Sequence, residues 1–176
     1  MRIGYPCINW TISCKGDRTF RLKSYSEERL IETVENNLNC LQEILAFNID
    51  HTLLFFRITS DLVPFASHPI NQFDWQGHFK HKFEGLGAFI TRHGIRISLH
   101  PDQFTLINSV NTEVFERSVK ELLYHAEVLD LMELDTTAKI QLHVGGVPAN
   151  RSARLQKAGR KKVSACDLWR LLVVKI

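Results

Sequence analysis

The chain has 176 residues, 44% of them hydrophobic and 23% charged, a composition typical of one soluble domain with a buried core. No apolar stretch is long enough for a membrane span, and the first residues lack the apolar region and cleavage site of a signal peptide. The four cysteines show no CxxC spacing, so we expect neither a zinc knuckle nor a disulfide framework, and we expect a reducing cytoplasm.

Positive charge is concentrated at the end of the chain. Residues 150–176 hold eight of the 22 Lys and Arg but one of the 19 Asp and Glu, so this segment carries +7 and the rest −4. Such a tail could bind nucleic acid as a flexible arm, or it could be an aberrant, unpacked end. Residues 151–162 contain no aromatic side chain for stacking on bases, which favours the second interpretation.

The first half of the chain reads as strand, helix, strand. Residues 3–8 form a short apolar strand. Ser24 and Glu27 have the spacing of a capping box for a helix whose apolar side chains continue at helical intervals to Leu45. Residues 53–58 are almost continuously apolar, which is typical of a strand buried in a parallel sheet.

The same alternation continues. A helix is predicted over residues 78–92 and ends at His93-Gly94, followed by a strand at 95–100. Asn111 or Thr112 can cap the next helix, which continues to Leu131, and a fourth strand follows at 139–144.

Strands alternating with helices predict parallel pairing, in an α/β fold that is either an open doubly wound sheet or a closed βα (TIM-type) barrel. Residues 6–10 after the first strand are not a glycine-rich phosphate loop, so we favour the barrel. A complete barrel takes about 250 residues and eight strands. The four strands found here therefore predict about the first half of one, over residues 1–147, with 148–176 as a divergent basic tail.

Three histidines occupy matching positions, where metal ligands are expected in such a barrel. His100 and His143 end the third and fourth strands, and His68 lies in the loop after the second. Loops after barrel strands build the active site, and neutral imidazoles suit Zn, Mn, Fe or Co. The remaining histidines are expected to be solvated or locally hydrogen-bonded: His51, His78, His81, His93 and His125.

Metal clusters that hydrolyse phosphate esters usually include bridging carboxylates as well. Asp61 is one candidate, and Glu133 and Asp135 are more remote ones. An Asp in a Ser-Asp loop more often serves as a turn or cap residue, so the carboxylate half of the site is not evident.

Four motifs together resemble the UV-damage endonuclease family, in its order and over about residues 2–147. They are GYPCIN at 4–9, RITSDLVP at 57–64, SLHPDQF at 98–104 and LHVGG at 142–146. The resemblance implies a βα-barrel nuclease that nicks DNA on the 5′ side of pyrimidine photoproducts in alternative excision repair. It implies a cluster of divalent ions, manganese first and zinc as the alternative, and no small-molecule cofactor.

Individual positions carry further implications of the resemblance. His68, His100 and His143 match family metal ligands, and Gln103 with Phe104 matches the amide and aromatic pair that probes the lesion. Tyr5 and Asn9 match residues of the first strand on the DNA-facing side. The partner implied is ultraviolet-damaged double-stranded DNA, bound in the cytoplasm at the nucleoid.

The chain departs from the family after Val147, where further ligands would follow, and a frameshift or truncation near residue 148 would explain the change in composition. We therefore expect that the isolated chain does not incise DNA, and that exposed sheet edges favour self-association. The alternatives are another metal-dependent barrel enzyme, such as an apurinic-site endonuclease or a sugar isomerase, and a non-catalytic DNA-binding remnant.

Overall fold

A computed structural model describes residues 2–109, 111–143 and 171–174 of the chain. Five strands make one sheet: β1 (Gly4–Pro6), β2 (Phe55–Ile58), β3 (Arg96–Leu99), β4 (Lys139–His143) and β5 (Leu171–Val174). Three long helices are α1 (Glu27–Asp50), α2 (Trp75–His93) and α3 (Thr112–Leu131), and two short 3-10 helices are η1 (Leu22–Ser24) and η2 (Ser60–Leu62).

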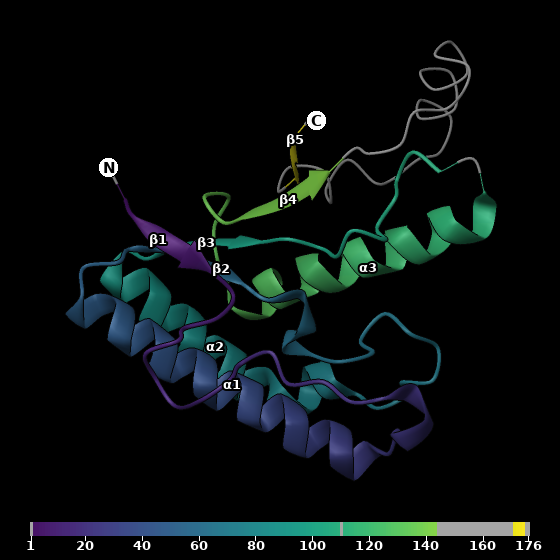
Figure 1. The fold of residues 1–176 in the computed structure, drawn as a ribbon, viewed down its shortest axis with the longest axis horizontal. Coiled ribbons are helices and arrows are strands. Elements are labelled where there is room, and N and C mark those ends of the chain that lie inside the picture. The colour runs from purple at the N-terminus through teal and green to yellow at the C-terminus, as the bar shows by residue number, and fades with distance from the viewer. Residues whose placement is uncertain (1, 110, 144–170, 175–176) are drawn as a thin grey trace.

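The sheet is parallel throughout, and its strand order β1-β2-β3-β4-β5 follows the order of the chain. Figure 1 shows α1, α2 and α3 together on one face of it. A doubly wound sheet reverses its strand order and has helices on both faces, whereas a βα barrel does neither. The described part of the chain is thus arranged as the open wall of a barrel.

Two details differ from the predictions. The capping residue of α1 is Ser26, whose side chain accepts a hydrogen bond from the N–H of Arg29, while Ser24 belongs to η1. The fifth strand was not predicted, although its run of four apolar residues is a strand signal. The other predicted boundaries agree within five residues, with the largest difference at the end of α1, and the left-handed Gly94 ends α2 with a φ of 63° as predicted.

Side chains alternate between two unlike faces of the sheet. Phe56 and Ile58 of β2 are buried beneath the helices, and the equivalent positions of β3 and β4 are apolar as well. The opposite face carries Arg57, Ser98 and Gln141. Period-two alternation thus directs one face to the core and leaves a polar face for function.

The expectation of no disulfide was wrong, because the structure joins Cys14 to Cys40, with 5.7 Å between their Cα atoms. The bond links the connection after β1 to the middle of α1. A pairing between a loop and a helix 26 residues apart has no local spacing signal, since it depends on how the loop folds back. Among the described helices, none is both long and apolar enough to cross a membrane.

Acid should destabilise this fold through His125 of α3, which is fully buried. Burial lowers its pKa from 6.5 to about 4, so below pH 6.5 the unfolded chain takes up a proton that the folded chain does not. The resulting decrease in the free energy of unfolding begins below pH 6.5, is complete by about pH 4 and amounts to about 3 kcal/mol. Urea unfolding of His125→Gln should show a shallower dependence on pH over this range than wild type; equal slopes would contradict the assignment.

Candidate nucleic-acid interface

Three loops meet where the strands end, at what we call the carboxyl edge. They are the β1–α1 loop (residues 7–26), the β2–α2 loop (residues 59–74) and the β3–α3 loop (residues 100–111). Because neighbouring strands are parallel, their carboxyl ends lie along one edge of the sheet. Every predicted site residue lies in one of these loops except Tyr5, His143 and the remoter carboxylate candidates Glu133 and Asp135.

Aromatic side chains join the first two loops. The ring of Phe65 lies 5.2 Å from that of Phe20 and 6.0 Å from that of Tyr25, both in edge-on contact. The imidazole of His68 also contacts Phe65, with ring centroids 6.2 Å apart. This cluster fixes the loop that carries His68 against the loop that follows β1.

The ring of His68 is exposed, but one of its nitrogens is occupied. Nδ1 accepts a hydrogen bond from the backbone N–H of Ile70 at 3.1 Å, which leaves the proton of the neutral ring on Nε2. A histidine that binds metal through Nε2 carries its proton on Nδ1 instead. His68 can therefore bind a cation through either nitrogen only after the bond to Ile70 breaks.

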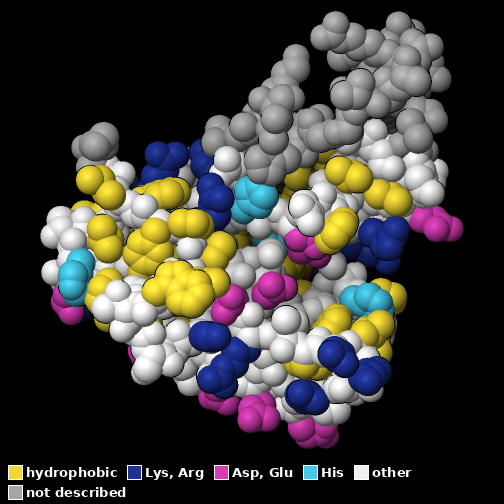
Figure 2. Space-filling view, viewed as in Figure 1, with side chains coloured by type: hydrophobic (Ala, Val, Ile, Leu, Met, Phe, Trp, Pro, Cys, Tyr) yellow, Lys and Arg dark blue, Asp and Glu magenta, His cyan; other side chains and the backbone are white. Residues whose placement is uncertain are grey.

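The other two predicted ligands lie on neighbouring strands. His100 directly follows β3 and is half-buried, close enough to His125 for its charge to lower the pKa of that buried ring. His143 is the last residue of β4, paired with Val174 of β5, and its side chain lies outside the described part. Among the described side chains, no group of three or more His, Cys, Asp or Glu could hold a metal ion, and Figure 2 shows histidines at separate places on one face.

Gln103 and Phe104 lie in a turn of the β3–α3 loop. The backbone N–H of Phe104 donates to the Asp102 carboxylate at 2.7 Å, and the flanking Pro101 and Thr105 are buried. Gln103 is exposed, and the Phe104 side chain is 74% exposed. The loop is thus anchored on both sides of an amide and an aromatic ring that face solvent, rather than packing the ring onto the sheet.

Tyr5 and Asn9 are engaged within the chain. The Tyr5 hydroxyl donates to the Asn48 side chain and accepts from the Asn9 amide, both at 2.6 Å, and burial raises the pKa of Tyr5 above its ordinary value. The side-chain Oδ1 of Asn9 accepts from the N–H groups of Thr11 and Ile12. These side chains shape the start of the β1–α1 loop, and their contact with DNA stays a prediction.

An arginine on the polar face of the sheet was not singled out from sequence. Arg57 of β2 donates to the side chain of Gln141 on β4 at 2.6 Å, spanning the strand between them. The Nε of Arg57 and the hydroxyl of its cross-strand neighbour Ser98 are buried, and neither has a hydrogen-bond partner among the described residues. Alternation in β2 places Arg57 opposite the core face, which is the signal that could have found it.

The carboxylates divide between the two ends of the sheet. Asp61 lies at the carboxyl edge, where partial desolvation and the negative charges of Asp17 and Asp102 raise its pKa. Glu133 and Asp135 come after α3 and before β4, at the opposite end of the sheet. Their suggested role as helpers of a metal at the carboxyl edge was therefore wrong, because a βα unit returns the chain to the amino edge before each new strand.

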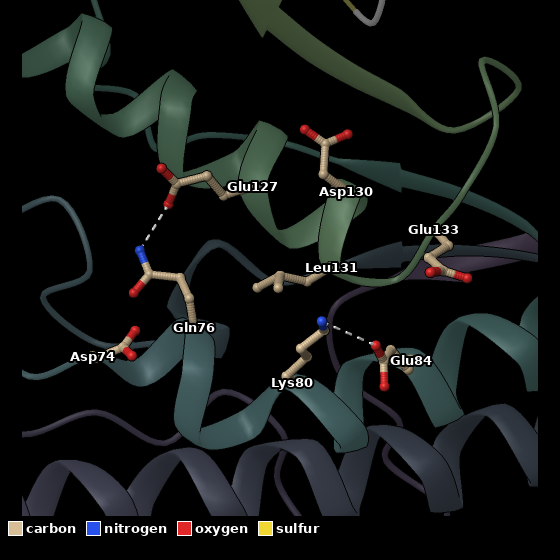
Figure 3. Close-up of a pocket in the computed structure, with 8 residues that line it drawn as sticks. All are labelled: Asp74, Gln76, Lys80, Glu84, Glu127, Asp130, Leu131 and Glu133. Carbon is tan, nitrogen blue, oxygen red and sulfur yellow. Dashed lines mark hydrogen bonds and ion pairs between the residues drawn. The ribbon is translucent and has the colours of Figure 1, made fainter.

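An acidic pocket of about 530 Å³ lies on the outer surface between α2 and α3 (Figure 3). Its lining holds five carboxylates and one lysine: Asp74, Gln76, Lys80, Glu84, Glu127, Asp130, Leu131 and Glu133. Lys80 pairs with Glu84 at 3.7 Å, and Gln76 donates to Glu127 at 3.2 Å. Negative charge here repels phosphates, which disfavours nucleic-acid binding on these helices.

Comparison with known proteins identifies one family to which the sequence is similar. A family model described as UV-endonuclease UvdE matches residues 1–170, which includes most of the segment set apart above as a divergent tail. A UV DNA damage endonuclease of Clostridium perfringens (strain 13 / Type A) is 39% identical over 175 residues, covering 98% of this chain and 42% of the relative. One of Bacillus thuringiensis subsp. konkukian (strain 97-27) is 32% identical over 165 residues, covering 89% and 52%.

A solved structure agrees with the fold. The crystal structure of SacUVDE matches with a TM-score of 0.90 at 40% sequence identity, over 98% of this chain and 60% of that one. The predicted βα-barrel class, only partly covered, is confirmed by this likeness. The chain spans about half the length of the curated relatives it matches.

Measuring the free energy of unfolding of two variants tests which site residues are buried and which are exposed. Tyr5→Phe should lower the free energy of unfolding by about 1–3 kcal/mol, because the side-chain N–H of Asn9 and the side-chain carbonyl of Asn48 are buried and lose their hydrogen bonds to the hydroxyl. Phe104→Ala should change it by less than about 0.5 kcal/mol, because the ring faces solvent. Urea unfolding measures both; a stable Tyr5→Phe or a strongly destabilised Phe104→Ala would contradict the structure.

Proposed function

This chain belongs to the UV-endonuclease UvdE family, and on that premise we propose that it binds ultraviolet-damaged duplex DNA along its carboxyl edge. The activity we propose for the enzyme is nicking of the DNA backbone 5′ to pyrimidine photoproducts. The observation that supports DNA recognition most directly is the solvent-facing Gln103 and Phe104 pair on a loop anchored by Asp102.

Lesion recognition follows from the cost of unstacking bases. A photoproduct has already lost part of its stacking, so extruding it costs less than extruding an intact pair. The ring of Phe104 would fill the space left between the neighbouring base pairs, and the amide of Gln103 would hydrogen-bond to exposed base edges. Because the loop is already held, little conformational entropy is lost when it enters the DNA.

A divalent metal, manganese or zinc, is part of this proposal through His68, His100 and His143. When bound, such an ion would activate water and stabilise the leaving oxygen. The side chains described do not assemble a complete site, and Nδ1 of His68 is engaged by Ile70. We therefore assign no step of hydrolysis to an ion in this chain, and we expect the isolated chain to bind damaged DNA without incising it.

Titration of irradiated and unirradiated duplex tests the proposal. Wild type should prefer the irradiated duplex, and Phe104→Ala should reduce that preference about ten-fold, since stacking on one base contributes about 1–3 kcal/mol. Leu123→Ala removes an exposed apolar side chain from α3 and should leave the preference unchanged.

Equal affinity of wild type for the two duplexes would overturn the proposed recognition.

Nicking is followed in the same samples with Mn²⁺ or with a chelator. Efficient cleavage at lesions that requires Mn²⁺ would contradict our expectation that this chain alone lacks the complete catalytic set.

A further inference from the structure

We propose that the β1–α1 loop is a second DNA-binding surface, in which Trp10 stacks on a base and the cations of the loop contact phosphates. This inference rests on the proposed function only in assuming that the carboxyl edge meets DNA. It concerns residues that neither the metal site nor the Gln103 and Phe104 pair includes.

Trp10 is the most exposed large hydrophobic side chain of the described residues, at 85%. The residue before it, Asn9, is buried, and its side chain accepts hydrogen bonds from the N–H groups of Thr11 and Ile12 at 2.8 and 3.2 Å. The backbone around Trp10 is therefore fixed while its indole faces water. A rigid, exposed aromatic ring is the kind of group on which a nucleic-acid base stacks.

The loop that carries Trp10 is strongly basic. Four exposed cations follow within fourteen residues, against the single carboxylate of Asp17. These cations are Lys15, Arg18, Arg21 and Lys23. Cations interspersed with an aromatic ring complement a phosphate backbone and its bases, and they would repel a basic protein partner.

The loop is held in place along α1, where Figure 1 shows it crossing the helix. Asn36 donates to the carbonyl of Lys15 at 3.0 Å, and Asn37 bonds both the N–H and the carbonyl of Arg18. The disulfide of Cys14 with Cys40 adds a covalent anchor. DNA binding therefore requires little ordering of this backbone.

The two DNA-binding loops follow strands on either side of β2. Neighbouring strands lie about 4.8 Å apart, so the carboxyl ends of β1 and β3 are about 10 Å apart. The two loops therefore leave the sheet at points separated by less than the width of the major groove, about 12 Å, which is within the span of one duplex.

Affinity measurements on Trp10 variants test the surface. Trp10→Ala should weaken binding to irradiated duplex about ten-fold, and Trp10→Phe should restore most of the affinity, because stacking needs an aromatic face rather than an indole. Ile3→Ala is the matched control, since Ile3 is 60% exposed at the opposite end of β1. In a Trp169→Phe background, the fluorescence lost in Trp10→Phe should be the component that DNA quenches, because Trp75 is buried.

The salt dependence of DNA binding tests the role of the cations of this loop separately. The double variant Lys15→Gln, Arg18→Gln should reduce the slope of log affinity against log salt by about 1.8, since each phosphate contact contributes about 0.9. Full affinity of Trp10→Ala together with an unchanged salt slope of the double variant would overturn this inference. The proposed function would still stand in that case if Phe104→Ala weakened the discrimination between the two duplexes. Absence of any DNA binding by wild type would instead overturn the proposed function, and the surface with it.

Discussion

The buried amide of Asn37 is the interaction on which the carboxyl edge depends. Its side chain is fully buried on the core face of α1, yet it donates to the carbonyls of Arg18, Asp61 and Leu62 and accepts from the N–H of Arg18. The β1–α1 and β2–α2 loops have no strand or long helix to satisfy these backbone groups. An unsatisfied buried group costs about 1–3 kcal/mol, so this one side chain favours the packing of both loops against α1.

Anchored loops also explain how the edge can present apolar rings to water. Phe104 and Trp10 follow residues, Asp102 and Asn9, whose side chains bond the backbone around the exposed ring. The contacts that each loop makes with the rest of the protein thus offset the free-energy cost of exposing the apolar ring to water. The opposite distribution of charge, basic on the β1–α1 loop and acidic on the outer α2–α3 surface, leaves one side of the molecule suited to phosphates.

Elements with strong periodicity were predictable from sequence, and contacts between distant residues were not. Alternating apolar strands and helical stripes predicted the order of β1 to β4 and α1 to α3, because each buries one face of its own sequence. The hydroxyl of Tyr5 bonds Asn48, 43 residues away, and nothing local indicates that partner. The tautomer of His68 likewise depends on a backbone N–H that only the folded loop supplies. The exposure of Phe104 was predictable only through its family motif, since a loop aromatic more often packs on the barrel mouth.

Amide hydrogen exchange of the chain with and without irradiated duplex tests most directly whether the carboxyl edge is the DNA-binding face. We expect slower exchange over residues 7–24 and 100–106 when DNA is bound, with no change over residues 76–84 of α2 beside the acidic pocket. Protection confined to α2 and α3, or binding without protection of either loop, would contradict it.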